Sequence, residues 1–269
     1  KLPNEVRQII NSDAEVVNKL GSNAMGNYLY VYKGVYATDE DVPVNPLTGE
    51  RLRMGGNTST QAYFKAGDPI WVDVNGDYII DEKDKVIVGN SQPRMTGGIS
   101  INLRYKAFSI NTNCSFTLRR DIINKALADR FRAYGTPVAG KVNLTGSGAL
   151  TPIEAYNFWT EDNIYAQYPN PFDYTRSSII QPFRYDQTLF MEDGSYFKIN
   201  GISVAYTIPK KMLDFFRISR CQLNFSMNNI YTFSKYSGIN PENVNNLGYD
   251  TSGGYPNGRT VTFGVSMDF

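Results

Sequence analysis

The chain has 269 residues and a formal net charge of +1, too small to indicate a nucleic-acid-binding protein. It contains no histidine, so neither histidine-based catalysis nor a histidine-ligated zinc site is expected. Its two cysteines, Cys114 and Cys221, form neither a CxxC motif nor a disulfide framework. No apolar run reaches the roughly 18 residues of a transmembrane helix, but membrane-spanning strands escape such a scan.

The N-terminal part gives few firm signals. The chain begins at Lys1 without a methionine or a signal sequence, so we expect a fragment or processed piece of a longer protein. A short helix is predicted from Glu5 to Leu20. The β-branched and aromatic run from Tyr28 to Tyr36 predicts a strand, and the prolines and glycines of residues 37–68 predict a loop.

The acidic segment from Asp73 to Asp84 has the spacing of a calcium-binding loop. The oxygen donors fall at positions 1, 3, 5, 7, 9 and 12 of an EF-hand-like pattern: Asp73, Asn75, Asp77, the carbonyl of Ile79, Asp81 and Asp84. The pattern departs from an EF-hand in having Tyr78 instead of glycine at position 6, and aspartate instead of glutamate at position 12. Two readings therefore stay open: a Ca²⁺ site that orders an external loop, or an Asx-rich turn that bonds its own backbone.

Strict alternation of apolar and polar residues begins at residue 99. Ile99, Ile101, Leu103 and Tyr105 share one face of a predicted strand. Only Lys106 and Ala107 separate it from a second strand, Phe108 to Leu118, which alternates in the same way. The long connection that follows, residues 119–194, contains helix-like pieces at 122–134 and 152–159.

Three further strands are predicted in the C-terminal part. The strand from Tyr196 to Ile208 changes phase near Asn200 and Gly201, which indicates a β-bulge. The next begins at Arg220 and extends to about residue 228. The last occupies residues 259–269 and places Val261, Phe263, Val265, Met267 and Phe269 on one face.

The lengths of the connections distinguish between the folds that such strands can build. They alternate short (106–107), long (119–194), short (209–217) and long (231–258). In an antiparallel meander the short turns then all lie at one end, as in an outer-membrane barrel with short periplasmic turns and long extracellular loops. We therefore predict an all-β fold, a segment of an antiparallel transmembrane β-barrel; a soluble β-sandwich is the alternative.

Several segments also carry a family resemblance. They include GNYLYVYKGVYAT (26–38), AGDPIWVDVNGDYIIDEKDKVIVGNSQPRMTGGIS (66–100) and FWTEDNIYAQYP (158–169), followed by DGSYFKINGISVAYTIPKKML (193–213), NNIYTFSKYSGINPE (228–242) and YPNGRTVTFGVSMDF (255–269). In this order they resemble the C-terminal part of SusC/RagA-type TonB-dependent receptors of the Bacteroidota outer membrane.

The resemblance implies that residues 1–269 form the C-terminal part of a barrel of about 22 strands, without the plug domain and the N-terminal region. It implies that the complete protein, located in the cell outer membrane, imports glycans or peptides as a transporter for nutrient uptake. Its partners would be a SusD-like surface lipoprotein and TonB, the latter contacted through the missing N-terminal part. No enzymatic activity is expected.

Two other functions agree less well with the sequence than import does. A soluble, calcium-stabilised surface β-domain that binds carbohydrate or protein would explain the acidic loop, but not the sorted loop lengths. A hydrolase would need a carboxylate pair in a cleft, which the sequence does not indicate. In the last long loop, Tyr236, Tyr249 and Tyr255 could stack on a sugar or on the lipoprotein, or could pack within the loop. Both cysteines are predicted on the apolar, lipid-facing side, and no residue pattern supports a disulfide between them.

Overall fold

The computed structural model describes residues 5–11, 14–19, 26–56, 58–134, 155–213, 218–245, 247–250 and 257–269. The chain forms two compact units. Unit 1 comprises Lys1–Gln92, Asp121–Glu192 and Asn243–Gly253, and unit 2 comprises Pro93–Arg120, Asp193–Glu242 and Gly254–Phe269. Within the described ranges, no helix is both long and apolar enough to cross a membrane.

Unit 2 is built on five long antiparallel strands in the order β15-β14-β13-β10-β9. The strands are β9 (Met95–Tyr105), β10 (Phe108–Leu118), β13 (Tyr196–Thr207), β14 (Arg220–Ser234) and β15 (Thr260–Asp268). A single turn of helix, α3 (Lys210–Leu213), lies between β13 and β14. Neighbours in the sheet follow one another along the chain, so this is the predicted meander.

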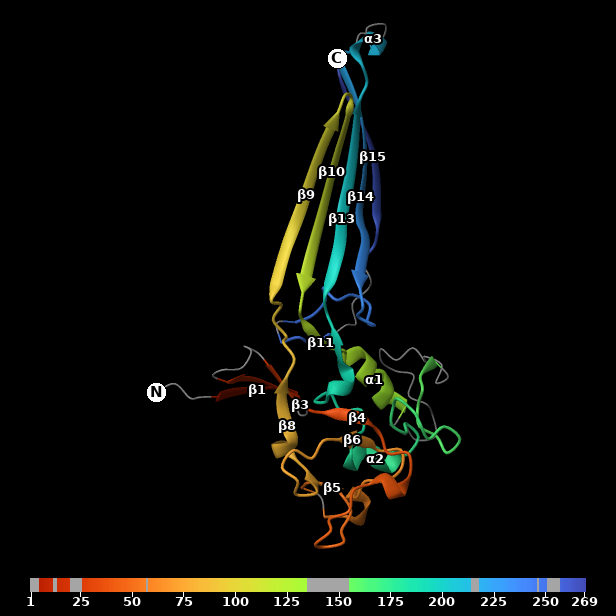
Figure 1. Ribbon diagram of the computed structural model, residues 1–269. Coiled ribbons are helices and arrows are strands. Elements are labelled where there is room, and N and C mark those ends of the chain that lie inside the picture. Colours follow the sequence, from red (N-terminus) through yellow and green to blue (C-terminus); the bar gives the residue numbers. More distant parts are fainter. Residues whose placement is uncertain are drawn as a thin grey trace. The chain divides into compact units, whose positions relative to one another are not determined.

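The two short connections of unit 2 lie at the same end of the sheet. Phe108 pairs with both Tyr105 and Tyr206, which places the two-residue turn at Lys106 beside the end of β13. Arg220 pairs with Asp268, so α3 and the C-terminus share that end (Figure 1). Lys106 adopts a left-handed φ of 52°, which lets so short a turn reverse the chain. The long connections leave from the opposite end, which confirms the predicted sorting.

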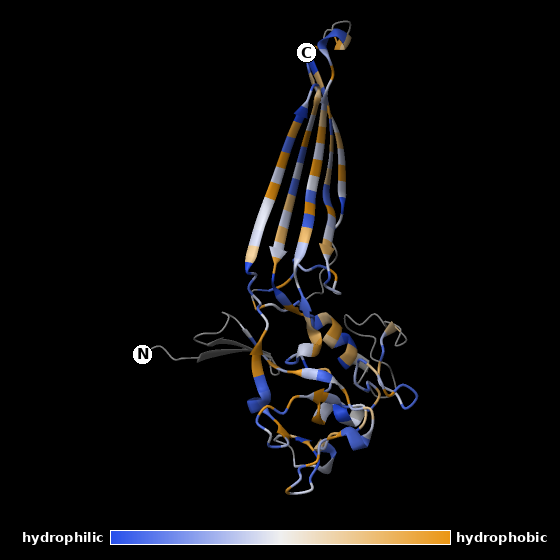
Figure 2. Ribbon diagram, in the orientation of Figure 1, coloured by the Kyte–Doolittle hydropathy of each residue, from blue (hydrophilic) through white to orange (hydrophobic). Residues whose placement is uncertain are grey.

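Apolar side chains form continuous rows across one face of this sheet. One row runs through cross-strand partners Leu103, Ile110, Val204, Phe225 and Phe263. Most of these side chains are exposed, up to 68% for Phe263, and hydrophobic and hydrophilic residues alternate along the strands in Figure 2. An apolar face of this size left uncovered is unusual for a soluble domain and typical of a lipid-facing barrel wall.

The other face of the sheet is polar and uncharged along most of its length. A typical row contains Asn102, Asn111, Ser203, Ser226 and Thr262. The predicted bulge is present: the register with β10 shifts between Ile199 and Gly201. The partner strand β14 carries an extra residue of its own at the same level, where Ile199 pairs with Tyr231. Phe197 and Phe233 therefore return to the apolar face beyond the bulge.

Unit 1 consists of short elements around two aromatic cores. A four-stranded antiparallel sheet has the order β1-β2-β3-β8, and three smaller pairs join β4 to β6, β5 to β7 and β11 to β12. The strands are β1 (Glu5–Asn11), β2 (Ala14–Lys19), β3 (Gly26–Tyr30), β4 (Tyr32–Val35), β5 (Arg53–Met54), β6 (Pro69–Trp71), β7 (Ile79–Ile80), β8 (Lys85–Val88), β11 (Asp121–Ile123) and β12 (Met191–Asp193).

The helices of unit 1 are short. They are α1 (Lys125–Tyr134), α2 (Tyr174–Ile179) and 3₁₀ turns at Asp39–Asp41, Thr60–Ala62, Glu82–Asp84 and Thr188–Phe190. Side-chain oxygens bond the first backbone amides of both α-helices: Asn124 accepts from the amide of Leu127, and Asp173 from that of Thr175.

Strand β3 is shared by the two cores because successive side chains of a strand point to opposite faces. Leu29 enters a core with Ile123, Phe131 and Phe190, whereas Tyr30 enters a second core with Phe64 and Trp71. In the first core, the ring of Phe131 on α1 makes edge contacts with several aromatic rings, with centroids 4.9 Å from that of Phe158. In the second, the rings of Tyr30 and Trp71 stack 5.2 Å apart.

One predicted helix is wrong. Residues 5–11 and 14–19 form the antiparallel strands β1 and β2. The β-branched residues Ile9, Ile10, Val16 and Val17 favour strands. The predicted helix at 152–159 lies partly outside the described residues, and from Tyr156 to Trp159 the chain is not helical. The helix predicted at 122–134 is confirmed as α1, which begins at Lys125. Strand β14 extends to Ser234, so the last long loop starts later than predicted.

Candidate functional site

In the acidic loop of unit 1, the predicted metal ligands accept hydrogen bonds from backbone amides. Asp73 accepts from the amides of Gly76 and Tyr78, at 2.7 and 2.8 Å. Asn75 accepts from the amide of Asp77, and Asp77 in turn accepts from the amide of Ile79, the residue whose carbonyl was the predicted ligand.

The two remaining carboxylates hold the 3₁₀ turn that closes this loop. Asp81 accepts from the amide of Lys83, and the fully buried Asp84 accepts from the amides of Val74 and Asp81, at 2.9 and 2.8 Å. Burial raises the pKa of Asp84, and these amide donors oppose that rise. Tyr78, at the glycine position of the calcium pattern, has a left-handed φ of 63°.

These contacts are those of an Asx-rich turn. Within the described ranges, no group of three or more His, Cys, Asp or Glu side chains is arranged to hold a metal ion. Calcium binding by residues 73–84 stays a prediction. A bound cation would have to draw these oxygens away from the backbone amides.

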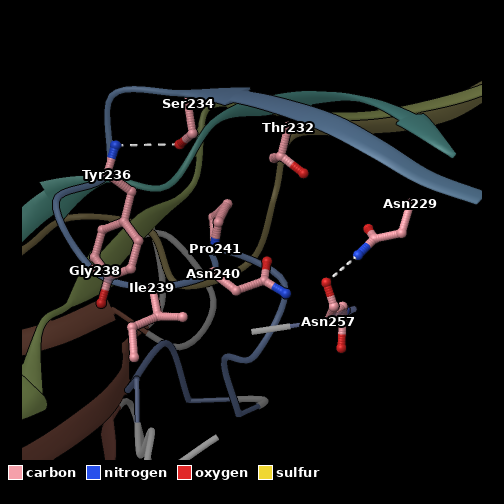
Figure 3. A pocket seen from close by; sticks show the side chains of 9 residues that line it. All are labelled: Asn229, Thr232, Ser234, Tyr236, Gly238, Ile239, Asn240, Pro241 and Asn257. Atoms are coloured by element: carbon pink, nitrogen blue, oxygen red, sulfur yellow. Dashed lines mark hydrogen bonds between the residues drawn. The ribbon is translucent and has the colours of Figure 1, made fainter. Parts of the chain in front are cut away.

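A different site lies in unit 2, on the polar face of β14 and at the end from which the long loops leave. It is a pocket of about 220 Å³ (Figure 3). It is bounded by one strand and two stretches of loop, with lining residues Asn229, Thr232, Ser234, Tyr236, Gly238, Ile239, Asn240, Pro241 and Asn257. None of these residues carries a charge, and most present amide or hydroxyl groups.

A departure from regular strand geometry shapes the pocket wall. Asn229 lies in the bulge of β14 and has a left-handed φ of 55°, which asparagine tolerates better than most residues. Its amide nitrogen donates to the backbone carbonyl of Asn257 at 2.5 Å, which joins β14 to the segment that precedes β15. Figure 3 shows this bond at one side of the pocket.

Two cations hold the opposite wall. Lys198 of β13 forms an ion pair with Glu242, and the guanidinium of Arg120 donates to the carbonyl of Pro241. The backbone amide of Glu242 donates to Oδ1 of Asn240 at 2.9 Å, which holds the side chain of Asn240 beside the ion-paired residue. Burial lowers the pKa of Arg120, while the nearby Tyr196 and Glu242 oppose that change. Neither cation is among the lining residues.

Several polar groups of the pocket are left without a protein partner in the described residues. The hydroxyl of Thr232 and the side-chain amide of Asn257 make no hydrogen bond there. Asn229 uses only its amide nitrogen, and Asn240 only its amide oxygen. Ser234 is satisfied, since its hydroxyl donates to the carbonyl of Ser195 and accepts from the amide of Tyr236. The pocket thus offers both donors and acceptors to a bound molecule.

The three tyrosines that were candidates for stacking on a ligand lie in different places. Tyr236 lines the pocket, with its ring against the backbone of Gly238, where an added Cβ would lie 2.4 Å from the ring. Tyr249 is 1% exposed in the first core of unit 1, so its ring is not accessible to a ligand and the predicted stacking is wrong for this residue. Tyr255 lies outside the described residues. Cys114 and Cys221 are free thiols opposite Ile99 and Met267 in the apolar rows, as predicted.

Comparisons with known proteins place these features in context. No protein-family model matches the chain. In sequence it is similar to TonB-dependent receptor P3 of Formosa agariphila, with 28% identity over 90% of this chain and 22% of that receptor. It is also similar to the TonB-dependent receptor SusC of Bacteroides thetaiotaomicron, with 23% identity over 93% of this chain and 24% of that receptor. The chain therefore spans about a quarter of the length of these relatives.

Solved structures show the same fold. Two structures of the RagAB peptide importer match 99% of this chain and 24% of their own, with TM-scores of 0.64 and 0.66 at 18% and 17% identity. The expected resemblance is confirmed, and with it the all-β, barrel-segment fold class and the outer-membrane location. The relatives are receptors and importers, not enzymes.

Proposed function

Because this chain is a homologue of TonB-dependent receptors, SusC among them, we propose that it forms the C-terminal part of the barrel of an outer-membrane nutrient importer. The observation that carries the proposal is the sheet of unit 2, with apolar rows exposed on one face and uncharged polar rows on the other. A wall of this kind separates lipid from an aqueous lumen.

The proposal extends to the whole protein. Its plug and TonB-contacting region lie outside this chain, and a SusD-like lipoprotein covers its extracellular face. The imported nutrients are glycans or peptides. Transport needs no bond-breaking step, only binding, gating and passage, so the pocket on the polar face of β14 serves as a contact point for the substrate and not as a catalytic centre.

The test is isolation of the native, full-length receptor from outer membranes, followed by gentle detergent extraction and mass spectrometry of the proteins that co-purify. We expect a heat-modifiable band accompanied by a surface lipoprotein, and uptake of its ligand that stops when the proton motive force is dissipated. A water-soluble, monomeric protein without such a partner would contradict the proposal and favour the surface β-domain.

A further inference from the structure

We infer that the pocket formed by Asn229, Thr232, Asn240 and Asn257 binds one uncharged sugar unit of the imported molecule. The inference rests on the proposed import function and specifies the class of ligand that binds at one place on the polar face. Its basis is the set of unsatisfied groups around about 220 Å³ of space.

The number of free polar groups in so small a space favours a sugar. The hydroxyl of Thr232 and the side-chain amide of Asn257 have no partner in the described residues, Asn229 keeps a free Oδ1, and Asn240 keeps a free amide nitrogen. Each hydroxyl of a sugar both donates and accepts, so a single ring can satisfy several such groups. A peptide residue brings only one backbone donor and one acceptor into the same space.

The volume also limits how much of a ligand is bound. Pockets that enclose whole drug-sized ligands measure about 300–1,000 Å³. This smaller and open space therefore holds one unit of a longer chain, whose remainder extends into the lumen.

The electrostatics favour an uncharged unit. A carboxylate or sulfate group would need a cation or several aligned donors. Lys198 and Arg120 do not line the pocket. Lys198 is held by Glu242, and Arg120 is held by the carbonyl of Pro241.

The experiment uses the full-length receptor, extracted together with its natural partners, and measures binding by calorimetry. The probes are size-fractionated oligosaccharides from starch, laminarin, xylan and agarose, oligogalacturonate as an anionic sugar, and a casein digest as a peptide mixture. The variants are Thr232→Val, Asn240→Ala and Asn257→Ala. The control is Asn102→Ala, which removes an exposed amide from the same polar face in another row.

We expect a neutral oligosaccharide to bind, each pocket variant to weaken it roughly 3- to 10-fold, and the control to leave it unchanged. Binding of the casein peptides or oligogalacturonate with the same variant pattern overturns the inference but leaves import intact. Neutral-sugar binding that the variants do not alter also overturns the inference and leaves import intact. The absence of any neutral-sugar binding in a receptor that still imports has the same meaning. Failure of the protein to reach the outer membrane contradicts the proposed function itself.

Discussion

At the scale of single residues, unit 1 is organised around one buried carboxylate. Asp186 is fully buried and forms ion pairs with Lys85, at 2.7 Å, and with Arg184. Both cations also lie over the ring of Tyr30, at 5.2 and 4.9 Å from its centroid. Charges removed from water are tolerated only when they are paired in this way. Asp186 therefore joins Lys85 of β8 and the segment of Arg184 around Tyr30 of β3.

The substitution Asp186→Asn should therefore loosen unit 1. It leaves two buried cations without their shared partner, which costs about 3–5 kcal/mol in comparable cases. Hydrogen exchange measured by mass spectrometry on the full-length receptor should show faster exchange in peptides covering residues 26–36 and 182–190. Glu82→Gln is the matched control: Glu82 also pairs with Lys85, but its side chain is 60% exposed, so a cost under about 1 kcal/mol is expected. Equal protection from exchange in the unmodified receptor and in both variants would refute this role for Asp186.

The sequence could predict residues that repeat a local pattern, but not those that depend on distant contacts. Val261 and Phe263 were placed on the apolar face because alternation is visible in the sequence alone. Asn229, Asn240 and Asn257 were not identified as a site, because a bulge and the Lys198–Glu242 ion pair bring them together. The only signal was a richness in asparagine along residues 228–257, which an ordinary loop shares.

At the scale of elements, β15 has one face that requires apolar side chains and one that accepts polar side chains. Val265, near its middle, belongs to an apolar row with Leu223, and Ser266 faces Gln222 on the polar side. Val265→Arg should cost about 2–4 kcal/mol if this face meets lipid. The measurable result is a smaller amount of heat-modifiable receptor in outer membranes.

Ser266→Arg serves as the control for this substitution, since it introduces the same side chain one residue away on the polar face. It should assemble close to the normal amount. If Val265→Arg assembles as well as Ser266→Arg, the assignment of the two faces is wrong.

The bulge in β13 is an element-scale feature with a prediction of its own. Asn200 is the residue of β13 that has no partner in β10, so deleting it removes the bulge and restores regular alternation. Ile199 stays opposite Cys114, and Phe197 stays opposite Phe116 on the apolar face. We therefore expect the deletion variant to keep the folded form on heat-modifiability gels. Asn200→Ala keeps the bulge and loses only the bond from Ser115, so it should assemble as well; loss of the folded form in the deletion variant alone would contradict the register.

At the scale of the whole molecule, the sequence predicted the barrel wall better than the rest. The strands of unit 2 alternate with period 2 and are joined by turns whose lengths reveal their topology, so β9, β10, β13 and β15 lie where predicted. Unit 1 carries no such repeat. Its strands are two to seven residues long and depend on pairing between distant segments, such as Tyr32 with Trp71.

The central claim is that one face of the five-stranded sheet meets lipid and the other meets water. It is tested most directly by spin labels placed one at a time from Leu223 to Met227 in the full-length receptor, with Cys114 and Cys221 first replaced by alanine. In outer membranes, labels at Leu223, Phe225 and Met227 should relax with oxygen, and those at Asn224 and Ser226 with a water-soluble nickel chelate. Equal exposure of all five labels to the nickel chelate would contradict a membrane-spanning wall.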